Sequence, residues 1–168
     1  DSAASWGGLN IAYHNLGMIS ADRGEWAEAE RYYDESFRTS ERIGEVHLQG
    51  LCRLNHSEVH LARQAFELAR ESAEAALAIF DQLGSRLDKS DAYRVLGVVY
   101  RETGRNALAE ARLKAAIEVA ISTGAVLSEA EASRELARLY QTMTRNQEAL
   151  TLLNRSWGLF RRLDAHLD

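Results

Sequence analysis

Apolar residues recur every three or four positions along this chain, and glycines interrupt the pattern at short intervals. In the clearest stretch, Tyr93, Leu96 and Tyr100 lie on one face of a helix. The pattern breaks around Gly104, because glycine commonly ends a helix, and a second helical stretch then runs to Gly124. The whole chain predicts eight helices, near residues 6–22, 25–43, 46–62, 65–83, 86–102, 105–123, 126–142 and 145–163.

The same features return at an interval of 40 residues. Small residues mark it in three series: Gly17, Ser57, Gly97 and Ala137; Ala29, Ala69, Ala109 and Ala149; and Gly44, Gly84 and Gly124, with Asp164 in the last repeat. A fixed period of this size indicates stacked repeats that bury their apolar faces against one another. We therefore expect four helix-turn-helix repeats, at residues 6–44, 46–84, 86–124 and 126–164, in a single array over residues 1–168. Within a repeat, small residues such as Gly97 and Ala109 allow two helix backbones to approach closely.

Composition agrees with a helical protein that works in the cytoplasm. Proline is absent from all 168 residues, as expected for helices joined by very short turns. The net charge of −5 argues against a nucleic-acid partner, and no apolar run is long enough to cross a membrane. The single cysteine, Cys52, excludes an internal disulfide and favours a reducing compartment. Because the chain starts at Asp1, we expect it to be a piece of a longer protein.

The third repeat carries the motif Tyr93-x-x-Leu96-Gly97-x-x-Tyr100, followed by Ala109-x-x-x-Leu113. This motif resembles the tetratricopeptide repeat (TPR), whose pattern is Trp, two residues, Leu-Gly, two residues, Tyr, then Ala, three residues, Phe. The resemblance covers nearly the whole chain and implies an all-α fold, a right-handed α-superhelix (α-solenoid) of eight antiparallel helices. The period is longer than the usual value of about 34 residues, and the late proline is missing. Both departures fit a longer second helix, a variant associated with scaffolds and bacterial regulators.

In TPR proteins the first helix of each repeat lines a concave face, so the register selects the residues that would contact a ligand. The resemblance implies a peptide-binding groove formed by Ile11, His14, Asn15, Met18, Leu51, Leu54, Asn55, Glu58, Arg94, Val98, Arg101, Arg134 and Arg138. Its N-terminal half is largely apolar, and Asn15 and Asn55 are placed to bond a peptide backbone. Its C-terminal half holds the four arginines, whose planar groups can each grip a carboxylate. We therefore expect a protein or peptide partner with an acidic part.

The arginines have a second interpretation, in which they pair with carboxylates of the chain itself. The nearby acidic residues are Asp91, Glu102, Glu131 and Glu135. Residues three or four positions apart meet on a helix surface, which makes Glu131 a candidate partner of Arg134. Arg138 lies seven positions from Glu131, two turns along the same helix face, and we take it as a second candidate partner.

Cys52, His56 and His60 follow one another at four-residue spacing and invite comparison with a zinc site. The outer two would lie about 12 Å apart along a helix, whereas zinc bonds are only about 2.0 to 2.3 Å long. The register places both histidines at packing positions, so we expect structural histidines, no metal and no cofactor. Trp26 and Phe66, which share one position after the turn, are likewise expected to pack between helices. No phosphate-binding loop or activated nucleophile is present, and the chain is not expected to be an enzyme.

The last helix lacks the polar outer face that usually closes a repeat array. Its apolar residues are Trp157, Leu159, Phe160 and Leu163. Either the protein continues past Asp168 or two copies pack end to end, as a homodimer through this uncapped helix. The sequence thus favours a scaffold or protein-interaction module that binds a peptide or helix in its groove. Two alternatives stay open: a sensory or regulatory segment of a bacterial signalling protein that controls an attached output domain, and a self-association module.

Overall fold

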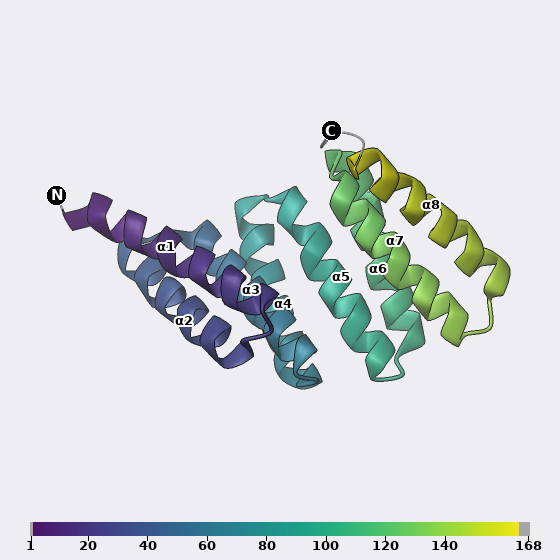
Figure 1. Cartoon of the computed structure of the whole chain (residues 1–168), viewed down its shortest axis with the longest axis horizontal. Coiled ribbons are helices and arrows are strands. Elements are labelled where there is room, and N and C mark those ends of the chain that lie inside the picture. Colours follow the sequence, from purple (N-terminus) through teal and green to yellow (C-terminus); the bar gives the residue numbers. More distant parts are fainter. Residues whose placement is uncertain (1, 165–168) are drawn as a thin grey trace. The chain divides into compact units, whose positions relative to one another are not determined.

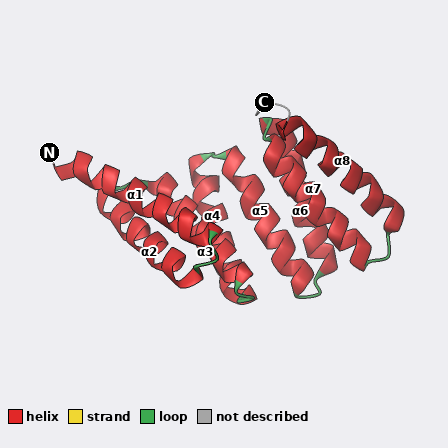
Figure 2. Ribbon diagram, viewed as in Figure 1, coloured by secondary structure: helices red, strands yellow, loops and turns green. Residues whose placement is uncertain are grey.

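The computed structural model describes residues 2–164, which form eight α-helices joined by short turns (Figures 1 and 2). The helices are α1 (Ser2–Asp22), α2 (Trp26–Ile43), α3 (Val46–Ala62), α4 (Phe66–Leu83), α5 (Arg86–Glu102), α6 (Asn106–Thr123), α7 (Val126–Thr142) and α8 (Asn146–Asp164). Residues 2–164 contain no strand, and none of their helices is both long and apolar enough to cross a bilayer. All eight predicted helices are confirmed. Each second helix of a pair begins one residue later than predicted, and α1 already begins at Ser2.

The turn inside each repeat passes through one residue with a left-handed backbone. The φ angles are 73° at Gly24, 59° at Gln64, 74° at Gly104 and 58° at Thr144. Glycine adopts this conformation freely, whereas another residue pays about 1 kcal/mol for it. The turn has the same backbone conformation at Gln64 and Thr144, so it does not require glycine. We infer that the packing of the two helices fixes its geometry, and that glycine only lowers the free-energy cost of the conformation.

The helices form two compact units, Asp1–Gly84 and Ser85–Asp168. In unit 1, α1 packs against α2, α2 against α3, and α3 against α4. In unit 2, α5 packs against α6, α6 against α7, and α7 against α8. Each unit therefore holds two of the predicted helix-turn-helix repeats. The continuation of all four repeats as one array stays a prediction.

Close packing between paired helices depends on the small residues of the 40-residue period. A Cβ atom on Gly17 would lie 2.5 Å from the ring of Tyr33, and one on Gly97 would lie 2.5 Å from Leu113 Cγ. The carbonyl of Ala109 is 3.4 Å from the same point at Gly97, and Ala109 itself is fully buried. The predicted close approach at Gly97 and Ala109 is confirmed, and a large partner residue occupies the space that each glycine leaves.

Candidate functional site

The unit 1 members of the predicted groove lie on α1 and α3, which contact each other. Ile11 and Met18 are 58% and 48% exposed and stand two helical turns apart on α1. His14 lies between them, with Nε2 3.4 Å from Asn55 Nδ2 of α3. Burial lowers the pKa of His14, so its imidazole is neutral near pH 7. Leu54, another residue of the predicted groove, is only 6% exposed and belongs to the core.

Behind this surface, a buried polar chain ties α1, α2 and α3 together. Ser36 donates a hydrogen bond to Asn10 Oδ1 at 2.6 Å. The Cys52 thiol in turn donates to Ser36 Oγ at 3.3 Å, and its Sγ is 3.9 Å from His14 Nδ1. Burial raises the pKa of Cys52 to about 11, so the thiol is protonated at neutral pH and is a poor nucleophile. This series of buried polar contacts supports the orientation of His14, and its cysteine is unreactive at neutral pH.

His56 and His60 pack against each other and against α2. Their rings are stacked with centroids 6.2 Å apart, and the ring of Tyr33 meets His56 edge-on at 5.8 Å. His56 is buried, with Nε2 3.1 Å from Asp34 Oδ1. Both histidines occupy packing positions, as the register predicts. Within the described part of the chain, no group of three or more His, Cys, Asp or Glu side chains is arranged to hold a metal ion.

A cavity of about 270 Å³ opens in unit 1 between α1, α2 and α3, and we name it the acidic cavity. Its lining residues are Ala21, Asp22, Trp26, Tyr33, Asn55, Glu58, Val59 and Ala62. Of these residues, Tyr33 and Val59 are buried, whereas Asp22 and Glu58 are exposed. Burial raises the pKa of Tyr33, and the negative charges of Glu58 and Asp22 raise it further. The cavity thus combines two carboxylates with a neutral phenol and an indole.

The sequence prediction includes Asn55 and Glu58 of the acidic cavity but neither Trp26 nor Tyr33, because it takes groove residues from first helices only. Trp26 packs against the buried cluster of Ala29, Tyr33 and Val59, as expected. It also borders the acidic cavity. The sequence signal for the cavity is at position 21, which holds alanine where the equivalent position 101 holds the much larger arginine.

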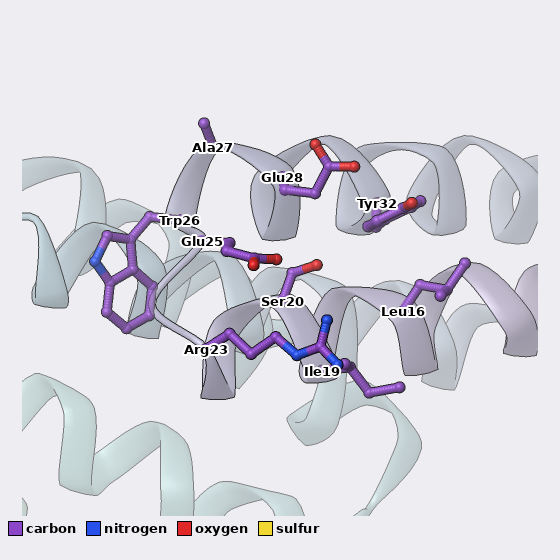
Figure 3. A pocket seen from close by; sticks show the side chains of 9 residues that line it. All are labelled: Leu16, Ile19, Ser20, Arg23, Glu25, Trp26, Ala27, Glu28 and Tyr32. Atoms are coloured by element: carbon purple, nitrogen blue, oxygen red, sulfur yellow. The ribbon is translucent and has the colours of Figure 1, made fainter.

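A larger cavity, of about 600 Å³, lies where α1 meets α2 in unit 1, and we name it the outer cavity. Figure 3 shows Ser20 and Glu25 between the two helices, Arg23 along α1 near Ile19, and Trp26 at one end. Leu16 and Ile19 line it and are 40% and 47% exposed. Their register equivalents in unit 2, Leu136 and Leu139, are 3% and 0% exposed, on α7, which α6 covers. The outer cavity therefore marks the helix face that the preceding second helix covers elsewhere in the chain.

In unit 2, all four groove arginines lie beside carboxylates of α5 and α7. Arg101 Nη1 is 2.7 Å from Glu135 Oε2, and Arg138 Nη1 is 2.8 Å from Glu135 Oε1. Arg134 Nε is 3.7 Å from Glu135, which is only 5% exposed. Burial opposes the charge of Arg101, but hydrogen bonds with Glu135 and Glu102 outweigh it and raise the pKa of this guanidinium. Glu135 is thus the centre of the arginine network.

The example of Glu131 as partner of Arg134 and Arg138 is therefore wrong. Glu131 lies across the helix interface, with Oε2 3.5 Å from Arg94 Nε of α5. It stands one helical turn before the buried position that Glu135 occupies. The broader interpretation of internal pairing is confirmed, because four arginines face four carboxylates: Asp91, Glu102, Glu131 and Glu135. These charges cancel, and Val98 among them is only 9% exposed.

Comparison with known proteins finds one matching family and several solved structures with a similar helical framework. The tetratricopeptide repeat family model matches residues 8–82, 51–122 and 88–162. The crystal structure of BtubC (BKLC) from P. vanneervenii is similar, with a TM-score of 0.74 and 17% identity over 92% of this chain and 64% of that one. The TPR-like repeats of a kinesin-light-chain-like protein from Podosopora anserina give a TM-score of 0.59 and 18% identity, over 92% of this chain and 76% of that one.

The present chain spans less than two thirds of BtubC, and no curated protein matches its sequence. The structural likenesses show the fold, an all-α repeat solenoid. Together, the three overlapping matches of the family model cover residues 8–162. The chain belongs to the tetratricopeptide repeat family.

Proposed function

We propose that the chain is a non-enzymatic protein-interaction module that binds a peptide or helix along the first helices of its repeats. TPR proteins bind protein or peptide partners and generally serve as interaction scaffolds. The observation that carries the proposal is the exposed apolar surface of α1, where Ile11 and Met18 flank Asn15. Apolar side chains of this kind supply affinity to a docked peptide, and an amide beside them can bond its backbone.

A carboxylate on the partner would have to compete with the carboxylates that already hold the unit 2 arginines. Of the four, Arg134 and Arg138 have the most exposed side chains, at 43% and 54%. Arg94 and Arg101 are 18% and 12% exposed. An acidic residue of the partner would therefore contact Arg134 and Arg138, while Arg94 and Arg101 hold α5 to α7.

The test begins with selection of random peptides by phage display on the 168-residue chain. The affinity of a selected synthetic peptide is then measured by calorimetry for the wild type and for the double variant Ile11→Glu, Met18→Glu. Both side chains are exposed, so the variant folds, and we expect affinity to fall at least about tenfold because two apolar contacts are lost.

The matched control is Leu68→Glu, Leu108→Glu. These residues are 51% and 48% exposed and lie on the second helices α4 and α6. Peptide binding should be unchanged in this control. The proposal is wrong if no peptide is selected, or if both double variants weaken binding equally.

Self-association is a second candidate function, favoured by uncovered apolar faces on α1 and α8. Trp157 on α8 is 67% exposed, whereas Phe37 and Ile117 at the same register position are half-buried. Leu16 and Ile19 on α1 are exposed as described above. In this alternative, α8 of one copy packs against α1 of the next, and the mass of the chain in solution tests it.

A further inference from the structure

We propose that His14 sets the direction of the Asn55 side-chain amide. While His14 is neutral, Asn55 presents its carbonyl oxygen to a backbone N–H of the bound peptide, and protonation of His14 reverses the amide. The inference rests on the proposed function and adds to it one contact and its dependence on pH. Both residues belong to the predicted groove, His14 on α1 and Asn55 on α3.

The contact between His14 and Asn55 defines the tautomer of the histidine. Asn55 Nδ2 lies 3.4 Å from His14 Nε2, and an amide nitrogen can only donate a hydrogen bond. Nε2 of the neutral ring must then be the acceptor, so the ring proton lies on Nδ1. Nδ1 is 3.9 Å from Cys52 Sγ, which is a weak acceptor for this N–H. The tautomer of His14 is thus set by a neighbour at each ring nitrogen.

The remaining bonds of the buried polar series run in the same direction. The protonated Cys52 thiol donates to Ser36 Oγ at 3.3 Å, and the Ser36 hydroxyl donates to Asn10 Oδ1 at 2.6 Å. His14, Cys52 and Ser36 therefore each receive one hydrogen bond and give one. Reversal of a single link would bring two donors or two acceptors together, so the series holds His14 in the Nδ1–H form.

Unit 2 shows that close packing of the helices does not need these polar groups. Positions 80 residues apart share one register, and the counterparts of Ser36 and Cys52 are Ala116 and Ala132. Both alanines are fully buried. In unit 1, by contrast, Asn10 is only 1% exposed, and its Nδ2 has no hydrogen-bond partner among the described residues, which costs stability. Polar groups that packing does not require, present at a cost, support a positioning role for the series.

The Asn55 carbonyl oxygen is available to a ligand. Within residues 2–164, the Asn55 side chain bonds only His14. Buried polar atoms without a partner occur elsewhere in this part of the chain, but the Asn55 oxygen is not one of them, so it is accessible to solvent. Because the amide nitrogen faces His14, the oxygen points away from the ring. It can therefore accept the backbone N–H of a peptide docked on α1 and α3.

Protonation of His14 makes this arrangement untenable. Both ring nitrogens then carry a hydrogen, and Nε2–H faces the Asn55 NH₂ group, so two donors meet without an acceptor. Rotation of the amide brings its oxygen to Nε2–H and turns the NH₂ group toward the peptide, where it opposes a backbone N–H. Burial lowers the pKa of His14, so the reversal occurs only as the pH falls below the ordinary histidine value of about 6.5.

The titratable groups that face His14 stay neutral over the same range. The Tyr33 ring of α2 lies 5.8 Å from the His14 ring between centroids, and Cys52 faces it from α3. Burial raises the pKa of both groups, and the charges of Glu58 and Asp22 raise that of Tyr33 further. The lowered pKa of His14 has burial as its cause. Of His14, Tyr33 and Cys52, only His14 changes charge between pH about 8 and about 5.

The tautomer is tested by NMR on the ¹⁵N-labelled 168-residue chain, without a ligand. Long-range ¹H–¹⁵N correlations of the ring distinguish the two tautomers, and we expect Nδ1–H for His14 at pH about 7.5, whereas free histidine favours Nε2–H. Nuclear Overhauser contacts should join the Asn55 NH₂ group to the His14 ring protons and disappear once the ring is protonated. An Nε2–H tautomer, or contacts that persist after protonation, would overturn the proposal.

Two variants remove the neighbours that position His14. Asn55→Ala deletes the donor to Nε2, and Cys52→Ala deletes the acceptor of Nδ1–H while supplying the alanine that unit 2 has at position 132. Each should shift His14 toward the Nε2–H tautomer. Asn15→Ala is the matched control, because Asn15 is the exposed register equivalent of Asn55 and should leave the tautomer unchanged. If His14 stays Nδ1–H in both variants, its neighbours do not position it and the proposal fails.

A peptide selected in the test of the proposed function identifies the contact itself. Synthetic versions carry an ester in place of one backbone amide at a time, which removes a single N–H. One ester should lower the affinity for the wild type about threefold to tenfold at pH about 7.5, yet leave the affinity for Asn55→Ala unchanged. The same ester should have little effect on the wild type at pH about 5, where Asn55 presents its NH₂ group. If no ester effect depends on Asn55, the contact does not exist.

The failures of the two ideas are distinguishable. A peptide whose affinity depends on Ile11 and Met18, but shows no ester effect that depends on Asn55, leaves the proposed function standing and removes the contact. If no peptide is selected, the proposed function fails, and the tautomer of His14 and the reversal of Asn55 still decide whether His14 sets the direction of the amide.

Discussion

At the scale of single residues, two glycines in the same unit have opposite roles. Gly97 faces Leu113, whose Cγ and Cδ2 would lie 2.5 and 2.7 Å from an added Cβ, whereas nothing lies within 4 Å of that point at Gly158. Both glycines are inside helices, where alanine is better by about 1 kcal/mol. Only at Gly97 does the added methyl group collide with a fully buried side chain.

We therefore predict that Gly97→Ala lowers the free energy of unfolding by about 1 kcal/mol, because overpacking costs about 1 to 3 kcal/mol and helix propensity returns part of it. Gly158→Ala should raise it by about 0.5 to 1 kcal/mol. Urea denaturation followed by circular dichroism measures both changes. A stabilised Gly97→Ala variant would show that Leu113 can move aside, and that the small residue is not required for the close approach of the helices.

The residue scale also shows what the sequence could predict. The recurrence of small residues at positions 17, 57, 97 and 137 predicts close contact between helices, and the structure confirms it at Gly97. It does not predict that Tyr33 fills the space beside Gly17 while Leu113 fills the space beside Gly97. The choice of partner depends on volumes in three dimensions, and a linear pattern of apolar positions does not contain them.

At the scale of elements, α5 and α7 are joined by a partly buried ionic contact. Arg101 Nη1 donates a hydrogen bond to Glu135 Oε2 at 2.7 Å, and Glu135 is almost fully buried. Removal of the arginine leaves a buried carboxylate that retains only the more exposed Arg138 and the distant Arg134. A buried charge that loses a partner destabilises a protein more than the pair stabilised it.

We predict that Arg101→Met lowers the free energy of unfolding of the chain by about 1 to 3 kcal/mol. The double variant Arg101→Met, Glu135→Leu should recover much of that loss, since it removes both charges from the interface. Arg31→Ala is the control, because the Arg31–Glu28 pair is exposed and its loss should leave the urea midpoint unchanged. Glu135→Leu is measured alone as well. If the double variant loses as much free energy of unfolding as the two single variants lose together, the contact does not couple α5 to α7.

Helices and their pairing follow from the sequence almost completely, but the contacts between elements do not. Apolar spacing and turn glycines predict every helix of residues 2–164, and the start of each second helix is wrong by only one residue. By contrast, the choice between Glu131 and Glu135 depends on which face of α7 meets α5. Both carboxylates are within one helical turn of an arginine, so sequence distance alone does not separate them.

At the scale of the whole molecule, the packing of α2 against α3 predicts how α8 of one copy of the chain could pack against α1 of another. Where α2 covers α3, Glu30 bonds Arg63 at 2.8 Å and the guanidinium of Arg53 lies 4.2 Å from the ring centroid of Phe37. The residues of α8 at the positions of Glu30, Tyr33 and Phe37 are apolar: Leu150, Leu153 and Trp157. The corresponding face of α1 is also largely apolar: Tyr13, Leu16, Ile19 and Arg23. An interface between α8 of one copy and α1 of the next would therefore place Trp157 opposite Tyr13.

This arrangement predicts head-to-tail association, which differs from the homodimer through α8, one of the possibilities that the sequence leaves open. Sedimentation velocity of the 168-residue chain should show a mass that rises with concentration beyond that of a dimer, since a heterologous contact can repeat. Trp157→Glu and Ile19→Glu should each give a monomer, because each places a charge in the contact at an exposed position. An equimolar mixture of the two variants should form a heterodimer, since it retains one intact α8 face and one intact α1 face. Dimers of Ile19→Glu alone would instead indicate contact between two α8 helices, and a wild-type chain that stays monomeric at high concentration would exclude both arrangements.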